Sequence, residues 1–181
     1  MTDEPLRPAW SEPFTAEAIR QLTSSGPIAT ISPEWAYGSS SGKGVRVCVV
    51  DSGVEYDHPA LGNAVKGGIL VEYDPDVECG YRYEEDPSPR DLAGHGTACA
   101  GIVHSIAPDA EIYSVRVLGS DMHGRAIQFA AGLDWAIENG MQVVNLSLST
   151  AKEDYFALFH DLTDQAYFKN INLVCAVNNI P

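Results

Sequence analysis

The sequence predicts an α/β fold with a parallel sheet, and three observations predict it. Short apolar runs rich in β-branched residues recur along the chain and stop at turn residues, which is typical of buried strands. Longer amphipathic stretches with helical spacing separate these runs. The predicted strands and helices alternate along the chain, and strands that alternate with helices are joined by right-handed parallel crossovers. The predicted strands cover residues 45–50, 66–73, 112–117, 143–146 and 171–177.

The helices are predicted between these strands. The first opens near His95 and continues through small residues, the second covers 124–139 and closes at Asn139-Gly140, and the third covers 153–169. Residues 74–90 are rich in Asp, Glu, Pro and Tyr and are interpreted as a loop. Its carboxylates could hold calcium, but no regular ligand spacing is present, so a solvated loop is favoured.

The N-terminal part of the chain is less informative. Residues 1–12 are polar and rich in proline, a short helix is predicted over 15–22, and a further helical turn over 32–37. The first residues lack a basic region followed by an apolar one, so no secretory signal is identified and a cytoplasmic location is expected.

Composition narrows the function classes. The 181 residues carry a formal net charge of −14, with a pI near 4.5, so binding to phosphate backbones is not expected. No apolar run approaches the length of a membrane span. At this length and with 45% hydrophobic residues, one domain with a sizeable core is predicted.

The four cysteines do not have metal-site spacing. Cys48 and Cys175 lie in apolar strand patterns and Cys99 lies in a helix, so all three are predicted to be small buried thiols, whereas Cys79 lies in a polar loop. No metal cluster is expected. A Cys48–Cys175 disulfide is disfavoured in an intracellular protein.

The run Val45–Val50 ends at Asp51-Ser52-Gly53. In an open parallel sheet, ligands bind outside the carboxyl ends of the strands, so Asp51 is a candidate functional carboxylate. The alternative is a turn aspartate that bonds its own backbone.

A second motif places His95 between Gly94 and Gly96, with Thr97 next. Glycine on both sides allows backbone or substrate to approach the imidazole closely. A carboxylate such as Asp51 could fix the tautomer of this ring, which is the logic of an Asp–His pair that serves a nucleophile. A packing histidine is the alternative.

Together these motifs resemble the subtilisin-like serine proteases. The resemblance runs from about residue 42 to 179, and the order Asp before His fits this family. It rests on Asp51-Ser52-Gly53, His58-Pro59, Gly94–Thr97, Ala100-Gly101, Ile106–Pro108, Val115–Leu118 and Val144–Ser147. It implies a three-layer parallel sheet with helices on both faces, incomplete at its C-terminus. Residues 1–41 would then be a lead segment, and 42–181 the N-terminal portion of a peptidase domain.

The resemblance also implies site residues. Asp51 and His95 would be catalytic, and the amide of Asn179 would help to bind the oxyanion, with Asn178 as a competitor and a turn-forming Asn pair as the alternative. Ser147, Leu148, Ser149 and Gly124 would contact substrate. Ser149-Thr150 stands where the family has Gly-Gly, which would narrow the pocket for the substrate side chain. Residues 121–124 replace a glycine-rich edge segment, so Met122 and His123 could shape a pocket instead.

The family's nucleophile motif, Gly-Thr-Ser-x-Ala, does not occur in the 181 residues. Ser52, Ser147 and Ser149 lack its context. We therefore expect an inactive chain that forms part of a serine endopeptidase acting on peptides or proteins, with the remainder of the domain as its partner and no cofactor beyond the calcium considered above. The alternative is a non-catalytic peptide-binding or regulatory domain. A phosphoacceptor domain is disfavoured, because Gly53 stands where a second acidic residue is needed.

Overall fold

The computed structural model describes residues 36–86, 90–150 and 152–176. The chain divides into two compact units, residues 1–40 and 41–181, and every element discussed below belongs to the second. The helix predicted over 15–22 and most of the turn predicted over 32–37 lie outside the described residues.

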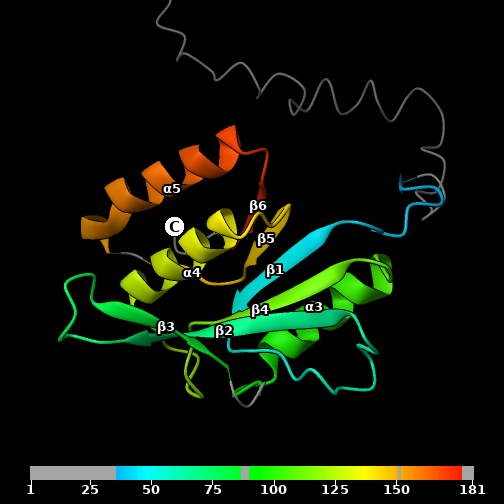
Figure 1. Cartoon of the computed structure of the whole chain (residues 1–181), viewed down its shortest axis with the longest axis horizontal. Coiled ribbons are helices and arrows are strands. Elements are labelled where there is room, and N and C mark those ends of the chain that lie inside the picture. Colours follow the sequence, from blue (N-terminus) through cyan, green and yellow to red (C-terminus); the bar gives the residue numbers. More distant parts are fainter. Residues whose placement is uncertain (1–35, 87–89, 151, 177–181) are drawn as a thin grey trace, which may run out of the picture. The chain divides into compact units, whose positions relative to one another are not determined.

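One six-stranded sheet organises the described part of the second unit, in the order β3-β2-β4-β1-β5-β6 (Figure 1). The pairs β1–β4, β1–β5, β2–β4 and β5–β6 are parallel, and only the short β3 pairs antiparallel, with β2. The strands are β1 (Arg46–Asp51), β2 (Val65–Tyr73), β3 (Tyr81–Glu85), β4 (Glu111–Arg116), β5 (Val143–Leu146) and β6 (Asn172–Cys175).

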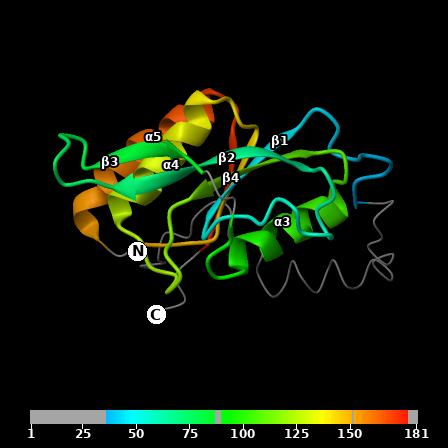
Figure 2. The same cartoon turned by 60° about the horizontal axis from the view of Figure 1, so that its bottom comes forward.

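Helices cover both faces of this sheet. Helix α3 packs on one face and helices α4 and α5 on the other, as Figure 2 shows. Helix α5 is preceded by the 3₁₀ turn η2, so the long helix predicted over 153–169 begins as a tighter turn. The helical segments are α3 (His95–Ile106), α4 (Ala126–Glu138), η2 (Glu153–Tyr155) and α5 (Phe156–Phe168).

The central strand β1 explains why both layers hold together. Its side chains alternate between the two faces, as strand geometry requires. Cys48 and Val50 pack in the core shared with α4 and α5, whereas Val49 packs in the core shared with α3. All three are fully buried. The apolar run noted in the sequence is therefore buried on both faces, as expected for a parallel strand.

The loop predicted over 74–90 is partly wrong, because it contains β3. Four of the five residues of β3 are exposed, so the segment lacks the apolar pattern that would have identified a strand. Tyr83 ties this hairpin to the helix layer, because its hydroxyl donates to the Ala131 carbonyl oxygen in α4 at 2.9 Å.

The prediction of three buried thiols holds only for Cys48. Cys175 is exposed because β6 is the edge strand of the described sheet, and Cys99 is partly buried. Cys48 and Cys175 are not neighbours, since β5 lies between their strands, and all four cysteines are free. Burial raises the pKa of the Cys48 thiol well above its usual range.

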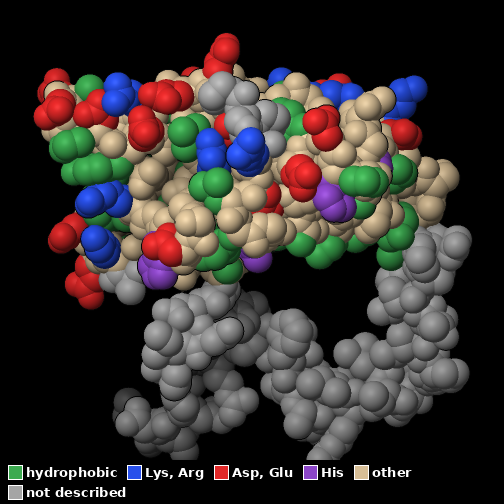
Figure 3. Space-filling view, turned by 90° about the horizontal axis from the view of Figure 1, so that it is seen from below, with side chains coloured by type: hydrophobic (Ala, Val, Ile, Leu, Met, Phe, Trp, Pro, Cys, Tyr) green, Lys and Arg blue, Asp and Glu red, His purple; other side chains and the backbone are tan. Residues whose placement is uncertain are grey.

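The surface agrees with the acidic composition. On the face shown in Figure 3, Lys and Arg side chains lie in small separate groups among acidic ones. None of the helices in the described segments is long and apolar enough to cross a bilayer.

Candidate active site

Asp51 is the last residue of β1, and its side chain is completely buried. A buried carboxylate needs hydrogen-bond donors to offset the loss of hydration. The backbone N–H of Ser52 donates to Asp51 Oδ1 at 2.7 Å. The tight turn after β1 therefore supplies one of the donors that hold this carboxylate.

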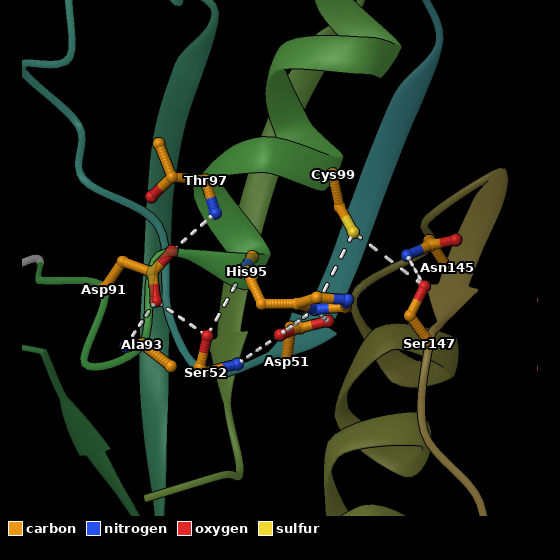
Figure 4. Close-up of polar contacts among 10 residues, drawn as sticks. Asp51, Ser52, Asp91, Ala93, His95, Thr97, Cys99, Asn145 and Ser147 are labelled. Atoms are coloured by element: carbon orange, nitrogen blue, oxygen red, sulfur yellow. Dashed lines mark hydrogen bonds and ion pairs between the residues drawn. The ribbon is translucent and has the colours of Figure 1, made fainter. Parts of the chain in front are cut away.

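His95 supplies the second donor. Its Nδ1 lies 2.9 Å from both carboxylate oxygens of Asp51 (Figure 4). The predicted contact between these two side chains is confirmed. A carboxylate only accepts, so this contact places the hydrogen of the neutral ring on Nδ1 and leaves Nε2 as an acceptor. The ring is 43% exposed while Asp51 is fully buried, so the pair opens to solvent on the histidine side.

Two glycines allow this approach. Gly94 precedes α3 with φ of +82°, a conformation that glycine adopts without strain. Gly96 packs so tightly on the turn after β1 that a Cβ would lie 2.0 Å from the Gly53 carbonyl oxygen. Gly96 therefore serves the close backbone approach that the sequence indicated, whereas Gly94 has open space around it and supplies the positive φ before α3.

A second carboxylate, Asp91, joins the two motifs, and the sequence analysis missed its role. Its Oδ1 accepts the Ser52 hydroxyl at 2.6 Å, and its Oδ2 accepts the Thr97 backbone N–H at 2.7 Å. Partial burial raises the pKa of Asp91, but hydrogen bonds from Ser52, Thr97 and Ala93 outweigh this and leave the pKa below its ordinary value. An Asp shortly before a helix start is a capping signal that could have identified the Thr97 contact.

On its other side, the Asp51–His95 pair borders Cys99 and Ser147. Cys99 Sγ lies 3.9 Å from His95 Nδ1 and 3.9 Å from Ser147 Oγ. Within the described ranges, Asp51, His95 and Cys99 form the one group of side chains whose ligand atoms converge closely enough for a metal ion. Burial raises the pKa of Cys99, which favours the neutral thiol over the thiolate that ligates metals.

The predicted substrate-binding residues lie beyond β5 and before α4. Ser147 Oγ accepts a hydrogen bond from Asn145 Nδ2 at 3.0 Å. Leu148 and Ser149 line a mostly apolar pocket of about 260 Å³. The other residues that line it are Phe129, Leu146, Thr150, Phe156, Phe159, Cys175 and Ala176. The structure thus brings Ser147 next to Cys99, which borders the Asp51–His95 pair, and brings Leu148 and Ser149 to a neighbouring pocket.

Gly124 has a packing role next to this pocket. A Cβ at Gly124 would lie 2.4 Å from the Val117 carbonyl oxygen and 2.6 Å from the Phe129 ring. The preceding segment forms a tight turn, in which the Gly119 N–H donates to the His123 carbonyl oxygen. The side chain of His123 is 85% exposed, so this ring extends into solvent.

The remaining predicted residues divide into three groups. Asn178 and Asn179 lie outside the described residues. His58 is partly buried and its Nδ1 accepts the Ala60 N–H at 3.2 Å, which is a structural role within its loop. In the described part of the 74–90 segment, Asp74 accepts the Asp76 N–H rather than gathering ligands, so calcium binding there stays a prediction.

The site combines a buried carboxylate with an exposed histidine at the carboxyl edge of a parallel sheet. This is the class of α/β site in which a histidine assists a nucleophile.

Comparisons with known proteins identify the family. The sequence profile of the subtilase family matches residues 42–180, and the chain belongs to this family. Subtilisin BL from Lederbergia lenta is 34% identical over 148 residues, which are 77% of this chain and 49% of that protein. Minor extracellular protease Epr from Bacillus subtilis (strain 168) is 32% identical over 82% of this chain and 22% of its own length.

A solved structure gives the same fold. A cold adapted subtilisin-like serine proteinase matches with a TM-score of 0.62 at 24% identity, over 78% of this chain and 49% of that one. This likeness supports the three-layer α/β fold. The chain spans about half the length of subtilisin BL and of subtilisin Savinase, another relative from Lederbergia lenta.

Proposed function

We propose that this chain is part of a subtilisin-type serine endopeptidase that hydrolyses peptide bonds in proteins or peptides. The observation that carries the proposal is the 2.9 Å contact between the buried Asp51 carboxylate and His95 Nδ1. This contact fixes the ring so that Nε2 can take a proton from a serine hydroxyl, and Asp51 stabilises the imidazolium that results.

The nucleophile itself is proposed to come from a segment outside these 181 residues. The chain covers about half of the length of subtilisin BL and less of Epr, and it has no Gly-Thr-Ser-x-Ala motif. Asn179 is proposed as the oxyanion donor. The exposed edge of His95 leaves room for a hydroxyl to approach the ring.

Substrate recognition is proposed to use the segment Ser147–Ser149 together with the apolar pocket beside it. Leu148, Phe129 and Phe159 line that pocket, so we propose that it accepts an apolar side chain of the substrate. Gly124 keeps the Phe129 side of the pocket closely packed.

The experiment compares the 181-residue chain with its longer reading frame. The longer protein should react with a fluorophosphonate probe and cleave a peptide library, whereas the 181 residues alone should do neither. His95→Ala in the longer protein should abolish labelling while circular dichroism shows the fold intact. Robust turnover by the 181 residues would contradict the proposal and return Ser147 and Ser149 to consideration. A folded longer protein that neither labels nor cleaves would favour a non-catalytic peptide-binding domain.

We also propose a cellular location for the protein and whether it needs calcium. We propose a cytoplasmic protein without an obligatory metal. One of its relatives is named an extracellular protease. Fractionation of the source cells, and activity measured with and without a calcium chelator, would test both statements.

A further inference from the structure

The polar network behind the catalytic pair has a centre that the mechanism above does not use. Asp91 accepts three hydrogen bonds: from Ser52 Oγ at 2.6 Å and the Ala93 N–H at 3.1 Å on Oδ1, and from the Thr97 N–H at 2.7 Å on Oδ2 (Figure 4). We propose that Asp91 is a positioning residue, which holds His95 against Asp51 by joining the turn after β1 to the start of α3. This inference rests on the proposed function and deepens it.

Helix α3 begins without a capping side chain at its N-cap. The first N–H groups of a helix have no partner within the helix, and the N-cap side chain normally accepts one of them. The N-cap of α3 is Gly94, which has no side chain to offer. Asp91 Oδ2 accepts the Thr97 N–H in its place. A carboxylate at this end also interacts favourably with the helix dipole.

Ser52 takes part in this network with both its side chain and its backbone. Its hydroxyl hydrogen is committed to Asp91, so its oxygen is left to accept the Gly96 N–H at 3.3 Å. The backbone N–H of the same serine donates to Asp51 Oδ1. Ser52 therefore contacts the catalytic carboxylate with its backbone and the residue after His95 with its side chain.

The Asp91 carboxylate holds these bonds in their observed directions. Without it, the Ser52 side chain can adopt another rotamer and donate elsewhere, so that its oxygen is no longer held where it accepts the Gly96 N–H. The same loss frees the Thr97 N–H at the first turn of α3. His95 is the first residue of that turn, so the ring loses two of the bonds that fix its backbone relative to Asp51. Asp91 acts through these neighbours and not by touching the ring.

The test uses two readouts that separate this inference from the proposed function. The first is the tautomer of His95 in the 181-residue chain, read from the ring ¹⁵N chemical shifts near neutral pH and assigned with His95→Ala. The wild-type ring should carry its hydrogen on Nδ1, held there by Asp51. Asp91→Ala and Ser52→Ala should both shift the population toward the Nε2–H form. This readout needs no nucleophile, so it decides the inference even if the longer protein proves inactive.

The second readout is the steady-state kinetics of the longer protein. A misplaced histidine slows the chemical step, so kcat should fall by about tenfold to a hundredfold in Asp91→Ala while KM changes little. The effects of Asp91→Ala and Ser52→Ala should be less than additive, because both interrupt one network.

Two further variants keep the test decisive. Asp91→Asn retains the shape and one acceptor oxygen, so it should fold and show an intermediate tautomer shift, because one oxygen cannot serve both Ser52 and Thr97. Gln128→Ala is the matched control, since the Gln128 side chain accepts the Arg125 backbone N–H at the start of α4, away from the pair. It should lower stability without moving the tautomer. If Asp91→Asn and Asp91→Ala both keep the wild-type tautomer, or shift it no more than Gln128→Ala does, the positioning role is overturned.

Discussion

The contact between strand β1 and helix α3 is buried and hydrogen-bonded, whereas the β6 edge of the described sheet is partly open to solvent. Between β1 and α3, Asp51 is fully buried and hydrogen-bonded, and the adjacent turn is tied to the helix by Ser52 and Asp91. On the other side, β6 is the edge of the described sheet, and Val174 at its centre is 55% exposed. Parallel strands are normally covered on both faces.

One part of the site is therefore held in place by its own contacts. The pairing of Asp51 with His95 depends on contacts among Asp51, Ser52, Asp91 and residues 95–97, all of which the structure describes. The apolar pocket that we propose for substrate depends on β5, β6 and the start of α5, where the exposed Phe156 and Cys175 form part of the lining. We therefore expect substitutions to be costly around β1, α3 and α4, and cheap on the outside of α5 and β6.

The largest difference in the free energy of unfolding is expected between alanine substitutions at a core leucine and at an exposed phenylalanine. Leu133 in α4 is 1% exposed, and Leu133→Ala should lower the free energy of unfolding by about 2–5 kcal/mol, because it removes buried surface and leaves a cavity. Phe168 near the end of α5 is 79% exposed, and Phe168→Ala should change the free energy by less than about 0.5 kcal/mol. Urea unfolding at neutral pH measures both. Similar losses in the two variants would show that the outer face of α5 is covered in solution.

A smaller difference in the free energy of unfolding is expected between alanine substitutions at two glycines of helix α3. A Cβ at Gly96 would meet the Gly53 carbonyl oxygen, so Gly96→Ala should destabilise the chain by about 1–3 kcal/mol and separate His95 from Asp51. Gly101 has open space around it, so Gly101→Ala should instead stabilise α3 by about 0.5–1 kcal/mol.

Thermal unfolding of the two variants, with the ¹⁵N shifts of His95 as a second readout, tests this pair. Equal effects of the two alanines would mean that α3 does not approach the turn after β1 as closely as the structure has it.

The sequence was sufficient for the parts of the fold that carry strong local patterns. The apolar run before Asp51 predicted the strand, because burial demands apolar residues, and the Gly-His-Gly motif predicted the Asp51–His95 contact, because the close approach of Gly96 to Gly53 leaves no room for a Cβ. The strand Val65–Tyr73 and the helix around Leu133 were predicted for the same reason.

Other features depend on contacts that no local pattern records. Strand β3 forms by pairing with β2, and its side chains are mostly exposed. Cys175 is exposed because β6 lies at an edge, although its own sequence is apolar. The role of Asp91 depends on Ser52, 39 residues earlier in the chain. Such long-range partners are determined by topology, which the sequence does not show directly.

The smallest expected effect is the dependence of stability on pH that Asp91 produces. Its pKa is lower in the folded chain than its ordinary value, so the folded state binds this proton less readily than the unfolded state does. The stabilisation is therefore complete above the unfolded pKa of about 3.9 and is lost as the pH falls through the folded pKa.

Asp91→Asn should be less stable than the wild type at pH 7, and this difference should shrink as the pH drops below about 4. Urea unfolding at pH 7, 5 and 3 measures this difference in the free energy of unfolding. Asp57→Asn is the matched control, because Asp57 is an exposed carboxylate between β1 and β2. A difference between wild type and Asp91→Asn that stays constant down to pH 3 would mean that Asp91 contributes by shape and not by its charge, and would remove the electrostatic part of its link between the turn after β1 and the start of α3.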